Sequence, residues 1–198
     1  MKGGIIMSKR DKLFDKFFSK KSKKVSPEIL TFIDEDVQKA IYRAYELNNI
    51  TDKDVIEKPI ILKMPESFYE SGTVNFLFHE KQNDVIYDQS LLVALFIGKK
   101  TMYYYQANID HRTGLIAGDI AGEIALDTVT NVETIFSSDD KDTHKSYLDL
   151  ELSTADGNTY AFRLRNQYVE KPSTHNVFLN ENEKYVLSQV KEAVRRAY

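Results

Sequence analysis

The clearest hydrophobic pattern in the chain lies between Ser90 and Tyr105, where two apolar stretches flank a short polar break. Residues 91–97 (LLVALFI) form an unbroken apolar run that ends at Gly98, and residues 101–105 (TMYYY) follow two lysines. Runs this short, rich in β-branched and aromatic residues and bounded by a turn residue, favour strands over helices. The pattern therefore predicts two strands joined by one tight turn, at the centre of a β domain.

Further strands are predicted on both sides of this pair. Residues 147–152 and 160–164 alternate between apolar and polar positions and flank Asp156-Gly157-Asn158, which is a strong hairpin signal. A short, irregular strand is predicted around Gly118 and Gly122. Other apolar patterns predict strands at residues 73–79, 123–126 and 129–136. The sequence after Gly72 thus predicts about seven strands.

Three segments show helical spacing instead. Residues 9–18 (KRDKLFDKFF) place four apolar residues on one arc of a helix. Ser26-Pro27-Glu28 has the composition of a helix start, and a helix is predicted over about residues 35–47, with residues 29–33 either continuous with it or a separate turn. Residues 186–197 also repeat apolar positions at helical spacing, and Asn180 with Glu183 supplies a capping-box-like start.

Two prolines, Pro59 and Pro65, mark the change from helical to β patterns. Proline removes a backbone donor and restrains the residue before it, so we place a boundary near the second one. The predicted organisation is a basic amphipathic N-terminal arm (residues 1–24), a helical extension (residues 25–65) and a β domain with a C-terminal helix (residues 66–198).

Charge is distributed unevenly along the 198 residues, although the formal net charge is only −3. Residues 1–24 contain nine Lys or Arg and two Asp, a net charge of +7, whereas the remainder contains 18 basic and 28 acidic residues, a net charge of −10. A polyanion would therefore meet the arm first. The chain has no cysteine, which fits a reducing compartment. The apolar run after the basic start, residues 5–7, is too short for a secretion signal, and the longest apolar run, residues 91–97, is too short for a membrane span, so a cytoplasmic, soluble protein is predicted.

The N-terminal arm is the candidate for peripheral contact with the inner face of a membrane. A short basic amphipathic helix of this type can lie on an anionic lipid surface. Two alternatives stay open: the helix docks on its own domain, or the arm is disordered and its phenylalanines contact an oligomeric neighbour. The candidate membrane-surface residues are Leu13, Phe14, Phe17, Phe18, Lys12, Lys16, Lys20 and Lys21.

No pattern of catalytic or metal-binding residues stands out. The four histidines are dispersed without the spacing of metal ligands, and no serine lies in a nucleophile-elbow motif. The acidic turn at residues 139–142 lacks the glycine and terminal glutamate of a calcium loop. The tyrosines at 103–105 alternate between the two faces of a strand, so base stacking, and with it nucleic-acid binding, is not expected on an acidic body. The sequence therefore predicts no catalytic residue, no metal site and no cofactor.

Three segments resemble the small bacterial pleckstrin-homology (PH)-like domains. LLVALFIGKKTMYYY is similar to the strand, basic turn and aromatic strand of those domains, and GEIALDTVTNVETIF and YLDLELSTADGNTYAFRLR are similar to their later strands and last hairpin. The likeness covers about residues 72–198. It implies an α+β fold in which a strongly bent antiparallel sheet, or partly open barrel, of about seven strands is capped by the C-terminal helix and preceded by the N-terminal helices.

The resemblance also implies a role in binding without catalysis. Lipid-binding members of the family grip phosphates with Lys and Arg near the first strands. The comparable turns here carry Lys99, Lys100, His111 and Arg112, which are the candidate ligand or lipid-binding residues. The expected function is a non-enzymatic PH-like interaction module that binds a protein partner or a second copy of itself. The alternative is peripheral membrane association through the basic N-terminus and anionic lipid headgroups.

Overall fold

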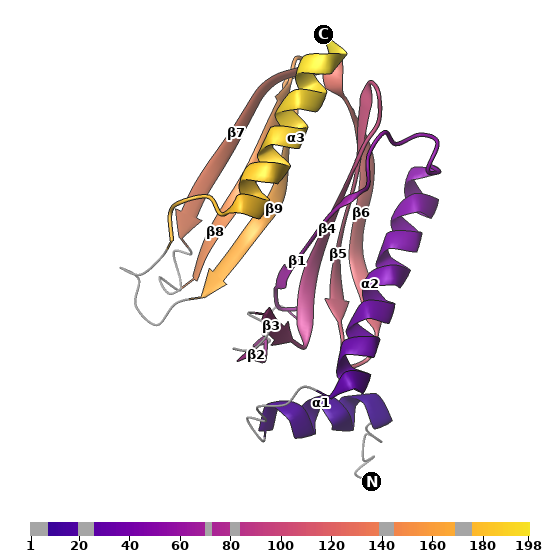
Figure 1. The fold of residues 1–198 in the computed structure, drawn as a ribbon, viewed down its shortest axis with the longest axis vertical. Helices are drawn as coiled ribbons and strands as arrows, with labels where there is room; N and C mark the ends of the chain where they lie inside the picture. Colours follow the sequence, from indigo (N-terminus) through magenta and orange to yellow (C-terminus); the bar gives the residue numbers. More distant parts are fainter. Residues whose placement is uncertain (1–7, 20–25, 70–72, 80–83, 139–144, 169–175) are drawn as a thin grey trace. The chain divides into compact units, whose positions relative to one another are not determined.

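Two helices, nine strands and a final helix follow one another along the described chain (Figure 1). The computed structural model describes residues 8–19, 26–69, 73–79, 84–138, 145–168 and 176–198. The elements are α1 (Lys9–Ser19), α2 (Pro27–Asn48), β1 (Ile60–Pro65), β2 (Phe76–His79), β3 (Asp84–Tyr87), β4 (Gln89–Ile97), β5 (Thr101–Asp110), β6 (Leu115–Ala125), the 3-10 turn η1 (Leu126–Thr128), β7 (Val129–Ser138), β8 (Lys145–Thr154), β9 (Thr159–Tyr168) and α3 (Glu181–Ala197).

The strands divide into three antiparallel sheets. Their strand orders are β1-β4-β5-β6, β2-β3 and β7-β8-β9. The predicted α+β class, the helices before the strands and the helix after them are confirmed. Within the described ranges no sheet is closed or strongly curled. The described strands therefore do not form the predicted single, strongly bent sheet of about seven strands. The period-two pattern had located most strands, but it carries no information on which strands pair.

The helix α2 is continuous over 22 residues, which settles the alternative that the sequence left open. Ser26 precedes it, and the carbonyl oxygen of Ser26 accepts a hydrogen bond from the Ile29 amide at 3.0 Å. Its buried stripe contains Ile29, Ile33 and Ala40 at helical spacing. Asp36 lies in the same stripe and is fully buried. An ionisable carboxyl group therefore points into the interior, where it needs partners.

Strand β1 was not predicted, because it lies within the segment assigned to the helical extension. Ile60, Leu62 and Met64 alternate as buried residues along it, and Pro65 is its last residue. The stretch is short and bounded by prolines, so its period-two signal is weak. Strand β6 also differs, since it joins two predicted pieces into one strand of 11 residues.

The described chain forms two compact units, each built from several segments. Unit 1 comprises residues 1–43, 65–92 and 106–119, and unit 2 comprises residues 44–64, 93–105 and 120–198. One apolar cluster of unit 1 consists of Phe14, Phe17, Ile29, Ile33 and Ile86. In unit 2 the helix α3 lies along the three-stranded sheet (Figure 1). Its buried residues are Val186, Val190, Ala193 and Glu183.

The predicted hairpin and the predicted helix start of unit 2 are both present. Strands β8 and β9 are joined through Gly157, whose φ of +89° is a conformation that favours glycine. At the start of α3 the Asn180 side chain accepts a hydrogen bond from the Glu183 amide at 2.9 Å, and the Glu183 carboxylate accepts one from the Asn180 amide at 2.8 Å. This reciprocal pair is a capping box, and it satisfies donors that a helix start otherwise leaves open.

Candidate functional site

A buried aspartate, histidine and serine form one hydrogen-bonded chain in unit 1. His111 Nδ1 lies 2.9 Å from Asp36 Oδ2, and His111 Nε2 lies 2.9 Å from Ser90 Oγ. Asp36 comes from the buried stripe of α2, Ser90 comes from β4, and His111 directly follows β5. The order of the three groups and the ring nitrogens they use are those of a Ser-His-Asp catalytic triad.

Burial argues against a catalytic role for this chain. Asp36, Ser90 and His111 all have side chains with no exposed surface. A nucleophilic oxygen has to reach a substrate carbon, and here the serine hydroxyl is enclosed. Two surface cavities of unit 1, of about 630 Å³ and 490 Å³, are lined by neither Ser90 nor His111. We therefore interpret the chain as a buried polar network in which Asp36 Oδ2, both ring nitrogens of His111 and Ser90 Oγ have partners, whereas Asp36 Oδ1 has no hydrogen bond to a described residue and lies 4.0 Å from Lys39 Nζ.

Arg10 of α1 completes this buried network. Its Nη2 pairs with Asp36 Oδ2, and its Nε donates a hydrogen bond to the His111 carbonyl oxygen at 2.6 Å. The guanidinium group also lies 4.7 Å above the ring of Phe32. Gly114 makes room for this arrangement, because its φ is +76° and a Cβ there would lie 2.9 Å from Arg10 Nη1. Arg10 thus ties α1 to α2 and to the turn after β5.

Arg112 forms a second charged cluster on the same turn. Its Nε donates to Asp88 Oδ2 at 2.7 Å, its Nη1 donates to Asp11 Oδ1 at 3.1 Å, and Nη1 also pairs with Asp15. Asp88 is fully buried and accepts two further hydrogen bonds from Asn75, at 2.9 and 2.8 Å. Burial lowers the pKa of the Arg112 guanidinium, but the carboxylates of Asp15, Asp88 and Asp11 raise it by more, so the group stays charged.

The four predicted ligand residues do not form one cluster. Lys99 and Lys100 are exposed in the turn before β5, whereas His111 and Arg112 follow the last residue of that ten-residue strand. Both ring nitrogens of His111 are engaged, and Arg112 is already surrounded by carboxylates. An incoming phosphate would have to displace these carboxylates before Arg112 could bind it.

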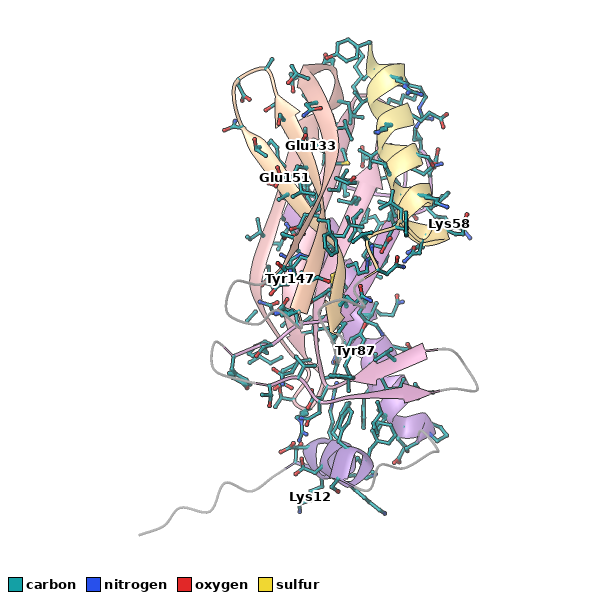
Figure 2. The ribbon with its side chains drawn as sticks, turned by 90° about the vertical axis from the view of Figure 1, so that its left-hand side faces the viewer. Lys12, Lys58, Tyr87, Glu133, Tyr147 and Glu151 are labelled. Carbon is teal, nitrogen blue, oxygen red and sulfur yellow. The ribbon has the colours of Figure 1, made fainter. Side chains whose placement is uncertain are left out.

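Helix α1 has one buried and one exposed face. Phe14 and Phe17 are buried in the apolar cluster of unit 1, and Phe18 packs against that cluster while partly exposed. Leu13 is also partly exposed, and the predicted membrane-surface residues Lys20 and Lys21 lie outside the described residues. Lys12 and Lys16 are exposed, and Figure 2 shows Lys12 on the outer side of the helix. In this structure the apolar face of α1 therefore packs against its own chain, as in the docked-helix alternative.

A β-bulge between β8 and β9 directs an arginine of unit 2 towards α3. Asp149 faces Arg163 across the strands, but the next pair is Leu148 with Arg165, so one residue of β9 is extra. Arg165 consequently points to the same side of the sheet as the buried Leu148. Its Nε makes an ion pair with Glu183 Oε1 at 2.9 Å, and both side chains are largely buried. The Nε has no hydrogen-bond partner, so this contact is electrostatic.

The same arginine fixes the segment that leads into α3. Arg165 Nη1 donates to the Asn176 carbonyl oxygen at 2.7 Å, and Nη2 donates to the Phe178 carbonyl oxygen at 3.1 Å. The Phe178 amide donates to Asn176 Oδ1 at 3.0 Å. The side chains of this held backbone are nevertheless open to solvent: Phe178 is 78% exposed and Val177 is 56% exposed. A large aromatic side chain is thus presented on an ordered backbone.

The described ranges contain neither a candidate metal site nor a helix that could cross a membrane. No group of three His, Cys, Asp or Glu side chains is arranged to hold a metal ion in that part of the chain. Nor does any helix described here combine the length and apolarity that a membrane crossing requires.

Sequence reasoning missed Asp36 and Ser90. A signal for Asp36 existed, because it occupies a position in the apolar stripe of α2, between Ile33 and Ala40. A charged residue at such a position needs a buried partner. Ser90 had no comparable signal, since it is the small residue at the start of an apolar strand.

Comparison of the chain with protein-family models, with curated proteins and with solved structures found no significant match. The resemblance to PH-like domains consequently stays a prediction from the sequence.

Proposed function

We propose that this protein is a non-enzymatic interaction module that binds another protein through Val177 and Phe178. The observation that carries the proposal is the exposure of Phe178 on a backbone that Arg165 holds in place. Aromatic side chains are enriched among the residues that dominate protein interfaces. A backbone that is ordered before binding loses less conformational freedom when the complex forms.

The likeness to PH-like domains is consistent with this role but is not needed for it. We propose that the antiparallel strands followed by α3 are a relative of that fold in which the described strands divide into separate sheets. A fold likeness alone specifies no ligand. The interaction role is therefore supported by the exposed residues and by the enclosed state of the Ser90 hydroxyl, which would otherwise suggest an enzyme.

A photo-crosslinking amino acid placed at Phe178 tests the proposal. It is incorporated into the full chain in the native cell, and the matched control carries it at Tyr42, which is 66% exposed in unit 1. We expect a discrete adduct from position 178 and none from position 42. The mass of the adduct distinguishes a partner protein from a second copy of this chain. Equal adducts from both positions, or no adduct at 178, would reject the proposal.

A second candidate function, binding to an anionic membrane surface, is favoured by the exposed face of α1. Lys9, Lys12 and Lys16 are exposed, while Phe14 and Phe17 are buried. Contact would then be electrostatic and would leave α1 docked, whereas the membrane hypothesis drawn from the sequence used the phenylalanines as the anchor.

Vesicle co-sedimentation tests this candidate. The wild-type chain should sediment with vesicles that contain phosphatidylserine but not with phosphatidylcholine alone, and the fraction bound should fall as salt is raised. The Lys12→Glu, Lys16→Glu double variant should lose binding while keeping its circular dichroism spectrum. Unchanged sedimentation of that variant would eliminate the candidate.

A further inference from the structure

Strand β7 is an edge strand in unit 2. It pairs with β8 on one side, and no strand of the described residues pairs with its other side. Its register with β8 is regular from Asn131 to Ser138, because the only irregularity lies between Val129 and Asn131. An edge of this kind offers a row of backbone donors and acceptors to an extended segment.

The edge lacks two of the usual protections against strand addition, lysine and proline. Exposed edges are commonly blocked by lysine or proline, and the β7 sequence VTNVETIFSS contains neither. Its single charged residue is Glu133, which is exposed. Threonine, valine and isoleucine, which favour strands, occupy half of its positions. The strand is thus suited to pairing on its open side.

Glu133 faces another glutamate across the β7-β8 pair. The register places it directly opposite Glu151, and Figure 2 shows the two side by side on neighbouring strands. On its other side Glu151 faces Ala161, which brings no charge. Neither glutamate has an ion-pair partner among the described residues. Like charges directly opposite each other destabilise a sheet, so this pair is a local cost of folding.

Asp149, two residues before Glu151 on the same strand, has the ion-pair partner that the two glutamates lack in the described part of the chain. Asp149 accepts from Arg163 Nε at 2.5 Å, and the same guanidinium group lies 3.9 Å above the ring of Tyr147. The sheet therefore neutralises one acidic residue of this face with a stacked arginine and leaves the two glutamates next to the open edge unneutralised. Proteins tolerate such local conflicts at sites of function.

We propose that the open edge of β7, between Asn131 and Ile135, binds an extended segment of a partner protein that places Lys or Arg opposite Glu133. A residue opposite Glu133 on an added strand would project from the same face as both glutamates, at a spacing of about 5 Å from the nearer one. One cation there would interact with two carboxylates. A second copy of the chain fits less well, because it would bring another glutamate pair to the same seam. This inference goes beyond the proposed function, since it concerns different residues.

The test uses two synthetic peptides, acetyl-TVTKTVT-amide and the matched acetyl-TVTETVT-amide, with the full chain. We expect the lysine peptide to shift and protect the backbone amides of residues 131–135 in NMR spectra, and to bind at least about fivefold more tightly than the glutamate peptide. The affinity should fall as salt is raised. Equal affinities, or shifts confined to other residues, would overturn the proposal, as would amides of residues 131–135 that are already protected in a dimer of the free protein.

Variants that change charge distinguish loss of peptide binding at β7 from loss of the fold. Glu133→Lys should weaken binding of the lysine peptide by at least about fivefold and yet raise Tm by about 2 °C, because it replaces a repulsive cross-strand pair by an attractive one. The control Glu46→Lys makes the same change of charge at an exposed position of α2 and should leave binding unchanged. Phe178→Ala should also leave peptide binding unchanged, so failure of one proposal does not imply failure of the other. A Glu133→Lys variant that binds the lysine peptide normally contradicts the proposal.

Discussion

Replacing Asp36 by alanine should destabilise unit 1 by about 3–5 kcal/mol. The carboxylate is fully buried and serves two partners at once, the Arg10 guanidinium and His111 Nδ1 at 2.9 Å. Removing one member of a buried pair leaves the other members without compensation, which costs more than the pair contributes. The Arg10 side chain is 14% exposed and the His111 side chain is not exposed. Water can therefore replace the lost partner of the arginine better than that of the histidine.

Urea unfolding and thermal unfolding, both followed by circular dichroism, give the change in free energy of unfolding and in Tm, and hydrogen exchange of residues 8–19 gives the location. We expect Asp36→Ala to lower Tm by about 6–20 °C and to accelerate exchange in α1, because Arg10 loses its anchor. The matched control is Asp34→Ala, since Asp34 is exposed on the same helix, and its effect should stay within about 0.5 kcal/mol. The reasoning is refuted if Asp36→Ala costs no more than this control.

A double-mutant cycle isolates the contact between α1 and α2. Arg10→Ala should be costly in the wild-type chain and much less so in the Asp36→Ala background, with a coupling energy of about 1–3 kcal/mol. Additive effects would mean that the two residues stabilise the protein independently, contrary to the contact between Arg10 Nη2 and Asp36 Oδ2.

Three further outcomes are expected. Phe14→Ala should cost about 3–5 kcal/mol in urea unfolding, because Phe14 is fully enclosed, and a cost below about 1 kcal/mol would show that α1 is not docked in solution. Gly157→Ala should cost about 1 kcal/mol, although no atom crowds the position, because its φ is +89°; a neutral effect would contradict that conformation. The Asp156 carboxylate accepts hydrogen bonds from the Thr154 hydroxyl and the Asn158 amide, and these lower its pKa. Its contribution to stability is therefore present above the ordinary aspartate pKa and is lost as pH falls through the lowered value. An NMR titration should show the lowered pKa in the wild-type chain and a return towards the ordinary value in Thr154→Ala, and no difference between the two would contradict the assignment.

Local features of the sequence predicted much of the fold. The capping box of Asn180 and Glu183, the glycine turn at Gly157 and the arc of phenylalanines in α1 each depend on residues within a few positions of one another. Such local features depend little on how distant parts of the chain pack. They located the hairpin and the first and last helices correctly.

The buried network could not be predicted in the same way. His111 and Asp36 are 75 positions apart, and no local pattern pairs them. The arc of Phe14 and Phe17 likewise shows that one face of α1 is apolar, but not whether lipid or Ile86 covers it. The division of the strands into sheets could not be predicted for the same reason, because period-two alternation identifies a strand but not the strands that pair with it.

The contacts between α1 and the turn after β5 have a consequence for the nascent chain during translation. Arg10 contacts His111 and Asp11 contacts Arg112, and each pair is 101 positions apart. Ribosomes add about 5–20 residues per second, so this helix waits about 5–20 s for the turn that receives it. Until Ile86 has been synthesised, Phe14 and Phe17 can pack only against the part of their cluster that α2 supplies, Ile29 and Ile33. Helix α1 therefore completes its contacts only after β5 and the turn that follows it have been synthesised, and a chaperone acting during translation could bind its exposed phenylalanines before then.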